Sequence, residues 1–376
     1  MPTERLKDAR RIVVKVGSNV MTARASLNLE VIHAISRQIC VLIDRGIEVI
    51  LVSSGAMAAG LRKLGLERRP DEIPKRQAIA AVGQGGLIHA YEDAFGHHDK
   101  KVAQILLTGE DLNNRRRYLN VRNAMGTLLG WKVVPIVNEN DTVMVEEIKL
   151  GDNDNLAAMI TLLMDADFLV NLTDIDGLYT KDPRTQPDAR IIPRVVTFKK
   201  EIEHFASHIP GALGTGGMLS KIKAARKVTA AGIPMIIAKG DKPDILLRLF
   251  SGEAHGTYFV PREKKMASRK CWIGYTLTPK GTLVIDGGAA RALVANGKSL
   301  LAGGILEVQG DFGVGAAVAL KGPSGEPVGV GLVNYTAGEI NLIKGLRTSQ
   351  IKSCLGEKPY DEVIHRDNLV LTGPSA

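Results

Sequence analysis

The sequence predicts an α/β layer fold with a mostly parallel, buried sheet, followed by a small β-rich domain. Short runs of β-branched residues alternate with longer segments whose apolar residues recur at helical spacing. This repeated order of strand and helix is typical of parallel sheets that helices cover on their faces. Near residue 260 the pattern changes to short runs punctuated by glycine, which predicts a small all-β or mixed barrel of roughly 80 residues.

The strand and helix candidates of the first part follow one another in a regular order. The predicted strands are residues 11–17, 48–55, 101–108, 132–139, 167–174 and 233–240. Residues 29–46 predict a helix, because Val31, Ile35, Ile39 and Leu42 recur at helical spacing before Gly46. Residues 56–65 predict the next helix. In the second part the strand-like runs lie within residues 281–289, 303–312 and 315–335.

The length of 376 residues suggests two domains, or one large and one small. The short basic stretch "PREKKMASRK", which begins at Pro261, reads as a linker. The sequence therefore predicts a main domain over residues 1–262 and a linker over 263–279. A small domain over 280–360 and a C-terminal tail over 361–376 complete the division.

Composition limits the classes of function. Hydrophobic residues make up 45% of the chain but aromatic residues only 4%, which argues against a platform that stacks single-stranded nucleic acid. The net charge of +9 fits either a soluble basic surface or an anionic partner such as a nucleotide, and charge alone leaves both open. The three widely spaced cysteines (Cys40, Cys271 and Cys354) predict neither a disulfide framework nor a zinc site. Without a signal core or an apolar run of about 18 residues, the expectation is a soluble cytoplasmic protein.

The loops that follow the predicted strands are the first places to look for a site, because ligands of parallel sheets bind beyond the carboxyl ends of the strands. Lys15 lies near the end of the first strand, either as a snorkelling side chain or as a fixed positive charge beside Gly17. Ser53, Ser54 and Gly55 lie between a strand and a helix. They fit an anion site and a plain helix cap about equally well.

The segment from Val137 to Ile160 is unusually rich in short amides and carboxylates. Seven of them lie between two apolar runs: Asn138, Asn140, Asp141, Asp152, Asn153, Asp154 and Asn155. Helix capping explains one or two of these residues. The remainder favours a ligand site for a small zwitterion, whose ammonium group carboxylates would bind and whose carboxylate amides would bind.

The segment "GALGTGGMLSKIKAA", which begins at Gly211, is a glycine-rich loop that leads into a helix and includes Lys221. Such a loop can bind phosphates through backbone N–H groups. It matches neither the Walker A motif nor G-x-G-x-x-G, because Leu219 occupies the last glycine position.

Two other patterns are better explained by solvated helix faces. His204 and His208 have i,i+4 spacing but lack further zinc ligands nearby. The basic run from Asn113 to Asn123 could bind nucleic acid, but a solvated face or a subunit contact explains it better, with Arg122 as the residue that could reach an anion.

Seven stretches, taken together and in order, resemble motifs of the glutamate 5-kinases of the amino acid kinase family. They span about residues 11–240 and read VVKVGSNV, SSGAMAAG, AAVGQ, VNENDTV, IKLGDNDNLAA, LTDIDGLYTKDPR and GTGGMLSKIKAA. Residues from about 280 to 358 resemble the PUA domain of many bacterial members, which the acetylglutamate, carbamate and uridylate kinases lack. The chain departs from the common pattern at Ser18-Asn19, where Thr-Ser is frequent, and at Leu219, where a polar residue is common.

The resemblance implies the amino acid kinase fold, an αβα sandwich with an eight-stranded-type sheet, and a PUA-like barrel. It also implies transfer of the γ-phosphoryl group of ATP, with Mg²⁺, to the side-chain carboxylate of L-glutamate. The product would be L-glutamyl 5-phosphate, in the first step of proline biosynthesis. Inhibition by proline, a homo-oligomer and a possible hand-over to glutamyl phosphate reductase are further implications.

The resemblance also assigns residues, position by position. Lys15 and Lys221 match the lysines that neutralise charge on the migrating phosphoryl group, and Asp154 matches an aspartate that orients them. The positions that match glutamate contacts are Ser54, Asn138, Asp141 and Asn153. The positions that match nucleotide contacts are Lys15, Thr173, Asp174, Thr215, Gly216, Gly217, Met218, Leu219, Ser220 and Lys221. No direct protein ligand of the metal is assigned.

The sequence leaves two alternatives to a glutamate kinase. A PUA domain could make the chain an RNA-binding or RNA-modifying protein. Between Lys280 and Tyr360, however, there are eight lysines and arginines and six acidic residues. This excess of only two positive charges argues against RNA as a partner. The other alternative is a sister kinase that phosphorylates a different carboxylate, such as that of aspartate.

Overall fold

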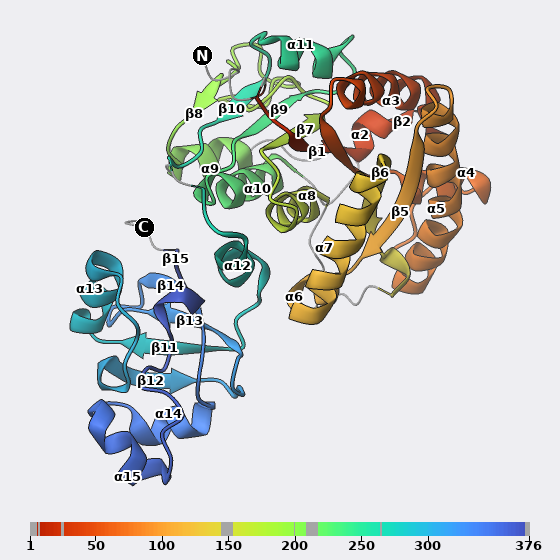
Figure 1. Cartoon of the computed structure of the whole chain (residues 1–376). Coiled ribbons are helices and arrows are strands. Elements are labelled where there is room, and N and C mark those ends of the chain that lie inside the picture. Colours follow the sequence, from red (N-terminus) through yellow and green to blue (C-terminus); the bar gives the residue numbers. More distant parts are fainter. Residues whose placement is uncertain are drawn as a thin grey trace. The chain divides into compact units, whose positions relative to one another are not determined.

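The structure is a computed structural model, and it describes residues 6, 8–23, 26–143, 153–198, 200–207, 217–263 and 265–372. The chain forms two compact units, Met1–Lys265 and Met266–Ala376 (Figure 1). Among the helices that can be described, none is both long and apolar enough to cross a membrane.

The first unit is built on an eight-stranded sheet of order β5-β6-β4-β1-β7-β9-β10-β8. Neighbouring strands are parallel except β9 and β10, which are antiparallel, so the predicted mostly parallel sheet is confirmed. The strands are β1 (Arg11–Val16), β4 (Glu48–Ser53), β5 (Lys101–Leu107), β6 (Val133–Glu139), β7 (Phe168–Thr173), β8 (Arg194–Val195), β9 (Met235–Lys239) and β10 (Thr257–Phe259). In a separate two-stranded sheet, β2 (Thr22–Ala23) pairs antiparallel with β3 (Ser26–Leu27).

Helices cover both faces of this sheet, as an αβα sandwich requires (Figure 1). Alternate β1 residues, Ile12, Val14 and Val16, share one core with α3 (Leu29–Asp44), α5 (Ile73–Gly96) and α11 (Ile245–Ser251). Lys15 points to the opposite face, where α8 (Asn153–Leu163) and α10 (Met218–Ala230) pack side by side. The other elements are α2 (Ser18–Met21), α4 (Ala56–Lys63), α6 (Gly109–Asn113), α7 (Arg115–Gly130), η1 (Asp141–Val143) and α9 (Lys200–Ser207).

Helices α4 and α5 approach one another closely because two glycines lie at their contact. A Cβ on Gly60 would lie 1.9 Å from the carbonyl oxygen of Ile79, and one on Gly83 would lie 1.8 Å from that of Ala56. No side chain fits at such distances, so the backbones touch directly. This contact fixes the position of the α5 segment that carries Gln84, which lies near the carboxyl ends of the strands.

We expect Gly83→Ala to lower the free energy of unfolding by about 1–3 kcal/mol, as overpacking typically does. Urea unfolding measures this change. Gly85→Ala is the matched control, because the space around Gly85 in the same helix is open. There the better helix propensity of alanine should stabilise the protein slightly. Equal effects of the two substitutions would contradict the close contact.

The second unit contains a five-stranded sheet of order β12-β11-β13-β14-β15, which confirms the predicted β-rich domain. Its strands are β11 (Gly281–Ile285), β12 (Ile305–Gln309), β13 (Ala317–Lys321), β14 (Pro327–Leu332) and β15 (Leu369–Leu371). Its helices are α12 (Ser268–Cys271), the π-helix η3 (Trp272–Thr276), α13 (Gly287–Asn296), η4 (Ala302–Gly304), α14 (Ala337–Ile343), η5 (Thr348–Gln350), α15 (Ile351–Leu355) and η6 (Arg366–Asn368).

Two segments at the margins of this unit differ from the predicted linker and tail. Within residues 263–279, Trp272 and Ile273 are buried, and a Cβ on Gly274 would lie 2.6 Å from a side-chain carbon of Val370. Within residues 361–376, β15 pairs with β14 in the sheet. Both segments therefore contribute to the folded unit rather than only flanking it.

Candidate active site

A buried carboxylate that binds two lysines lies at the carboxyl ends of the central strands. Asp154, in the first turn of α8, is fully buried. Its Oδ1 accepts hydrogen bonds from Lys15 Nζ at 2.6 Å and Asn171 Nδ2 at 2.8 Å. Its Oδ2 accepts from Ser220 Oγ at 2.6 Å and Lys221 Nζ at 3.1 Å. Each carboxylate oxygen thus has two donors, and the ammonium groups of β1 and α10 are held on either side of one anion.

Strand register brings the donors of Oδ1 together. Lys15 of β1 is the direct neighbour of Asn171 of β7, so their side chains share one face of the sheet. Val14 and Val16 belong to the core on the other face. An ammonium group and an amide N–H on an otherwise apolar sheet surface require an acceptor, and Asp154 accepts from both.

The two lysine charges decide the ionisation of Asp154. Burial alone would raise the pKa of this carboxyl group. The charges of Lys15 and Lys221, with hydrogen bonds from Lys15 and Ser220, outweigh burial and hold the pKa well below its usual range. Asp154 is therefore ionised at neutral pH, and the cluster of one carboxylate and two ammonium groups carries a net positive charge.

A second cluster of amides and hydroxyls begins one residue earlier in the chain. Asn153 donates through Nδ2 to Ser54 Oγ at 2.8 Å and to Asn138 Oδ1 at 2.9 Å. Asn138 in turn donates to Gln84 Oε1 at 2.9 Å. Among the residues that the structure describes, Asn153 Oδ1 is buried without a hydrogen-bond partner. Such an acceptor is costly unless a ligand donates to it, which points to a substrate group at this position.

Two buried hydroxyl groups at the end of β4 support this second cluster. Ser53 Oγ and Tyr91 OH, both buried, are 2.8 Å apart, and Tyr91 belongs to α5. Burial raises the pKa of Tyr91 far above its usual range, against a smaller lowering by the Ser53 hydrogen bond. The phenol therefore stays neutral and fixes the strand end that carries Ser54.

Asp141 begins the 3₁₀-helix η1, three residues after Asn138. Its carboxylate is partly buried, and burial raises its pKa, while the charge of Arg69 lowers it by less. Burial removes hydration that would stabilise the charged form of this carboxylate. A cationic ligand would restore that stabilisation, so the position favours binding of a cation.

Of the residues predicted to contact the nucleotide, Lys15 is on β1, Thr173 and Asp174 lie at the end of β7, and residues 218–221 form the first turn of α10. Asp174 accepts hydrogen bonds from Asn19 Nδ2 at 3.0 Å and from Thr173 Oγ1 at 3.0 Å. Burial opposes the ionisation of Asp174, but these two hydrogen bonds lower its pKa on balance.

In the glycine-rich loop, the described part starts at Gly217, which is the N-cap of α10 and has no side-chain cap. Met218 is buried, while Leu219 and Ser220 are half-buried, and the Ser220 hydroxyl donates to Asp154. The predicted contacts Thr215 and Gly216, and the acidic residue Asp152, lie outside the described residues.

Two residues of these clusters escaped the sequence analysis. Asn171 is the one amide in the apolar run of β7, and a search for buried polar residues, which singled out Lys15, could have found it. Gln84 is the last residue of the motif AAVGQ, but the sequence predicted no role for it. Of the patterns set aside, His204 is exposed on α9, which fits a solvated face, while its predicted companion His208 lies outside the described residues.

Comparison with known proteins places the chain in a family. Residues 10–239 match the model of the amino acid kinase family, and residues 281–355 match that of the PUA domain. The protein named glutamate 5-kinase of Syntrophus aciditrophicus is 49% identical over 366 residues, 97% of this chain and 95% of the relative. That of Carboxydothermus hydrogenoformans is also 49% identical, over 98% of this chain and 99% of the relative. The chain belongs to the amino acid kinase family.

Proposed function

We propose that this protein is an enzyme that transfers the γ-phosphoryl group of ATP to the side-chain carboxylate of L-glutamate. The relatives named glutamate 5-kinase, similar over nearly the whole chain, support this activity. The observation that carries it is the position of Asp154 beside Asn153, which joins the lysine cluster to the amide cluster. One end of the site is built for phosphate charge, and the other for a small polar substrate.

The chemistry requires charge neutralisation more than proton transfer. A free glutamate side chain, with a pKa of about 4.3, is already ionised at neutral pH, so the reaction needs no general base. A carboxylate must approach a phosphate that is also anionic. Lys15 and Lys221 supply fixed positive charge between them, and Asp154 sets where these charges lie. Asn153 and Asn138 would orient the substrate so that its carboxylate lies near the two lysine charges.

Mg²⁺ enters this proposal as a companion of ATP. Asp154 is a poor metal ligand, because four protein donors occupy its two oxygens. Asp174, with Asn19 and Thr173 as partners, is the carboxylate among the predicted nucleotide contacts. Bound Mg²⁺ usually keeps most of its ligands from phosphates and water, and there it would neutralise phosphate charge.

Hydroxamate formation with ATP and Mg²⁺ tests the activity directly. L-Glutamate, L-aspartate and N-acetylglutamate are compared in parallel, and we expect activity with L-glutamate alone. Activity with L-aspartate instead would favour a sister kinase. No activity with any of them would remove the enzyme proposal and direct attention to RNA binding by the PUA domain, which strong salt dependence would reveal.

Asp141 is proposed to bind the ammonium group of L-glutamate. We expect Asp141→Asn to raise the KM for glutamate about 10- to 100-fold, since a hydrogen bond to a charged group contributes about 1.5–3 kcal/mol. The KM for ATP serves as an internal control and should not change. Burial raises the pKa of Asp141, so kcat/KM for glutamate should fall as the pH drops through this raised pKa. The variant should lose that part of the pH profile.

We further propose that L-proline competes with L-glutamate, because both carry an α-carboxylate and an amine that Asp141 and Asn153 could bind. Initial rates at several glutamate concentrations test this: proline should raise the apparent KM and leave kcat unchanged. A rate unaffected by millimolar proline would contradict it.

The remaining expectations from the family resemblance stand as parts of the same proposal. They are a role in proline biosynthesis, a cytoplasmic homo-oligomer, and a possible hand-over of the labile acyl phosphate to glutamyl phosphate reductase. The proposed division keeps the catalytic domain at residues 1–262 and the PUA domain at 280–360. The segments at 263–279 and 361–376, predicted as linker and tail, contribute to the second folded unit.

A further inference from the structure

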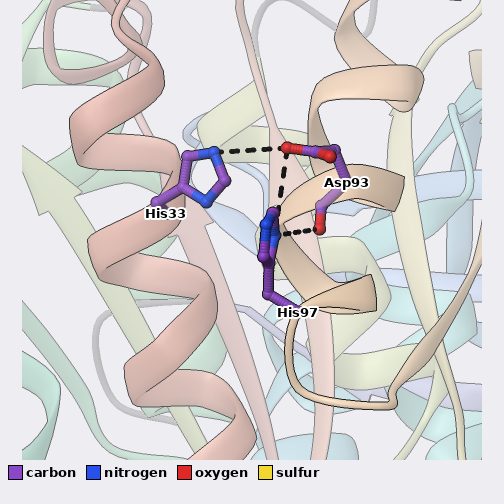
Figure 2. A group of neighbouring side chains, drawn as sticks. All are labelled: His33, Asp93 and His97. Carbon is purple, nitrogen blue, oxygen red and sulfur yellow. Dashed lines mark hydrogen bonds and ion pairs between the residues drawn. The ribbon is translucent and has the colours of Figure 1, made fainter.

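Two imidazoles and one carboxylate converge between α3 and α5, on a part of the first unit that the proposed reaction does not use. His33 projects from α3, while Asp93 and His97 lie one turn apart near the end of α5 (Figure 2). One ligand atom from each residue can be chosen so that all three lie within 4.8 Å of one another. We propose that these three side chains bind a divalent transition-metal ion of the Zn²⁺ type.

The distances suit such an ion with small side-chain adjustments. His33 Nε2 lies 3.5 Å from Asp93 Oδ2, and His97 Nδ1 lies 4.0 Å from the same oxygen. In a tetrahedral site with bonds of about 2.0–2.2 Å, neighbouring ligand atoms are about 3.4 Å apart. A hydrogen-bond contact between His97 Nδ1 and the Asp93 carbonyl oxygen at 2.8 Å must open, which an exposed ring can do by rotation.

The surroundings leave these ligands accessible. The side chains of His33, Asp93 and His97 are 41%, 57% and 62% exposed. Within the described part of the chain, the ion pairs of Asp93 involve the two histidines and no lysine or arginine. Imidazole nitrogens and a carboxylate oxygen are common ligands of divalent metal ions, and the carboxylate adds negative charge that favours a cation.

The donor set distinguishes this site from the nucleotide end of the active site. Two nitrogens and one carboxylate suit Zn²⁺ and its transition-metal neighbours, whereas Mg²⁺ and Ca²⁺ prefer oxygen ligands. With three protein ligands, the fourth position would hold water. Because His33 comes from a different helix than Asp93 and His97, a bound ion would cross-link α3 to α5 and stabilise the folded state.

Equilibrium dialysis against Zn²⁺ in excess Mg²⁺, followed by metal analysis, tests the site in the full-length chain. The Cys354→Ser background removes the exposed thiol, which could bind zinc by itself. We expect one Zn²⁺ per chain and a higher thermal unfolding midpoint with zinc. His33→Ala and His97→Ala should each weaken binding at least about tenfold.

His89→Ala is the matched control, because His89 is exposed on α5 and faces a carboxylate, Glu92, at 4.0 Å. This variant should bind zinc as the background protein does. Circular dichroism confirms that each variant folds. Binding that survives both His33→Ala and His97→Ala, or that His89→Ala weakens equally, would overturn the proposal, as would the absence of bound zinc from the background protein.

Discussion

Replacing Lys15 by methionine is expected to lower kcat about 10²–10³-fold, the loss typical when one preorganised group that stabilises transition-state charge is removed. Methionine keeps an unbranched side chain of similar reach but carries no charge. Asp154 would still bind Lys221, Ser220 and Asn171, so the remaining cluster stays paired. The loss should therefore appear in turnover more than in the KM for glutamate. Steady-state kinetics at saturating ATP and Mg²⁺ measure both constants.

Lys101→Met controls for the loss of a lysine as such, because Lys101 is exposed at the start of β5, the end of the strand away from the site. This variant should keep full turnover. If Lys15→Met kept kcat within twofold of the original value, Lys15 would have to be a structural partner of Asp154 and not a catalytic charge.

The layers of the fold could be predicted from the sequence because the strand signals there are local. A long run of β-branched residues such as that of β1 predicts a buried strand from its own residues alone. The three-residue strands β10 and β15 carry no such signal, and only pairing with β9 and β14 makes them strands. The antiparallel step in the sheet and the folded C-terminal segment were therefore not predictable.

The site was predictable as a set of residues but not as an arrangement. Lys15 and Asp154 are 139 positions apart, and Asp154 and Lys221 are 67 apart, so their contact depends on the register of the whole sheet. The position of Asn171 shows the limit most clearly. Its role follows from lying beside Lys15 in the neighbouring strand, and that register is not contained in either strand alone.

Asp154→Asn is expected to have the largest effect on stability, lowering the free energy of unfolding by about 3–5 kcal/mol, as removal of one partner from a buried ion pair does. It leaves the buried Lys15 and Lys221 without their shared anion. Turnover should fall as well, since the two charges lose the group that positions them. Urea unfolding and steady-state kinetics measure the two losses separately.

The pH dependence gives the sign of this effect. The folded protein holds the pKa of Asp154 below its unfolded value of about 3.9, so the carboxylate contributes its full stabilisation above that pH. The contribution declines as the pH falls from there toward the depressed folded pKa. The stability difference between the original protein and Asp154→Asn should therefore be constant near neutral pH and shrink below about pH 4.

Two comparison variants separate this buried cluster from ordinary surface charge. Asp188→Asn removes an exposed partner of Lys181 and should leave stability unchanged, because solvent screens such pairs. Asn171→Leu removes one donor from Asp154 but keeps both lysine charges, so it should reduce turnover less than Asp154→Asn does. A loss equal to that of Asp154→Asn would mean that the position of the carboxylate, and not its charge, limits the reaction. No loss would mean that the two lysines alone are enough to hold it in place.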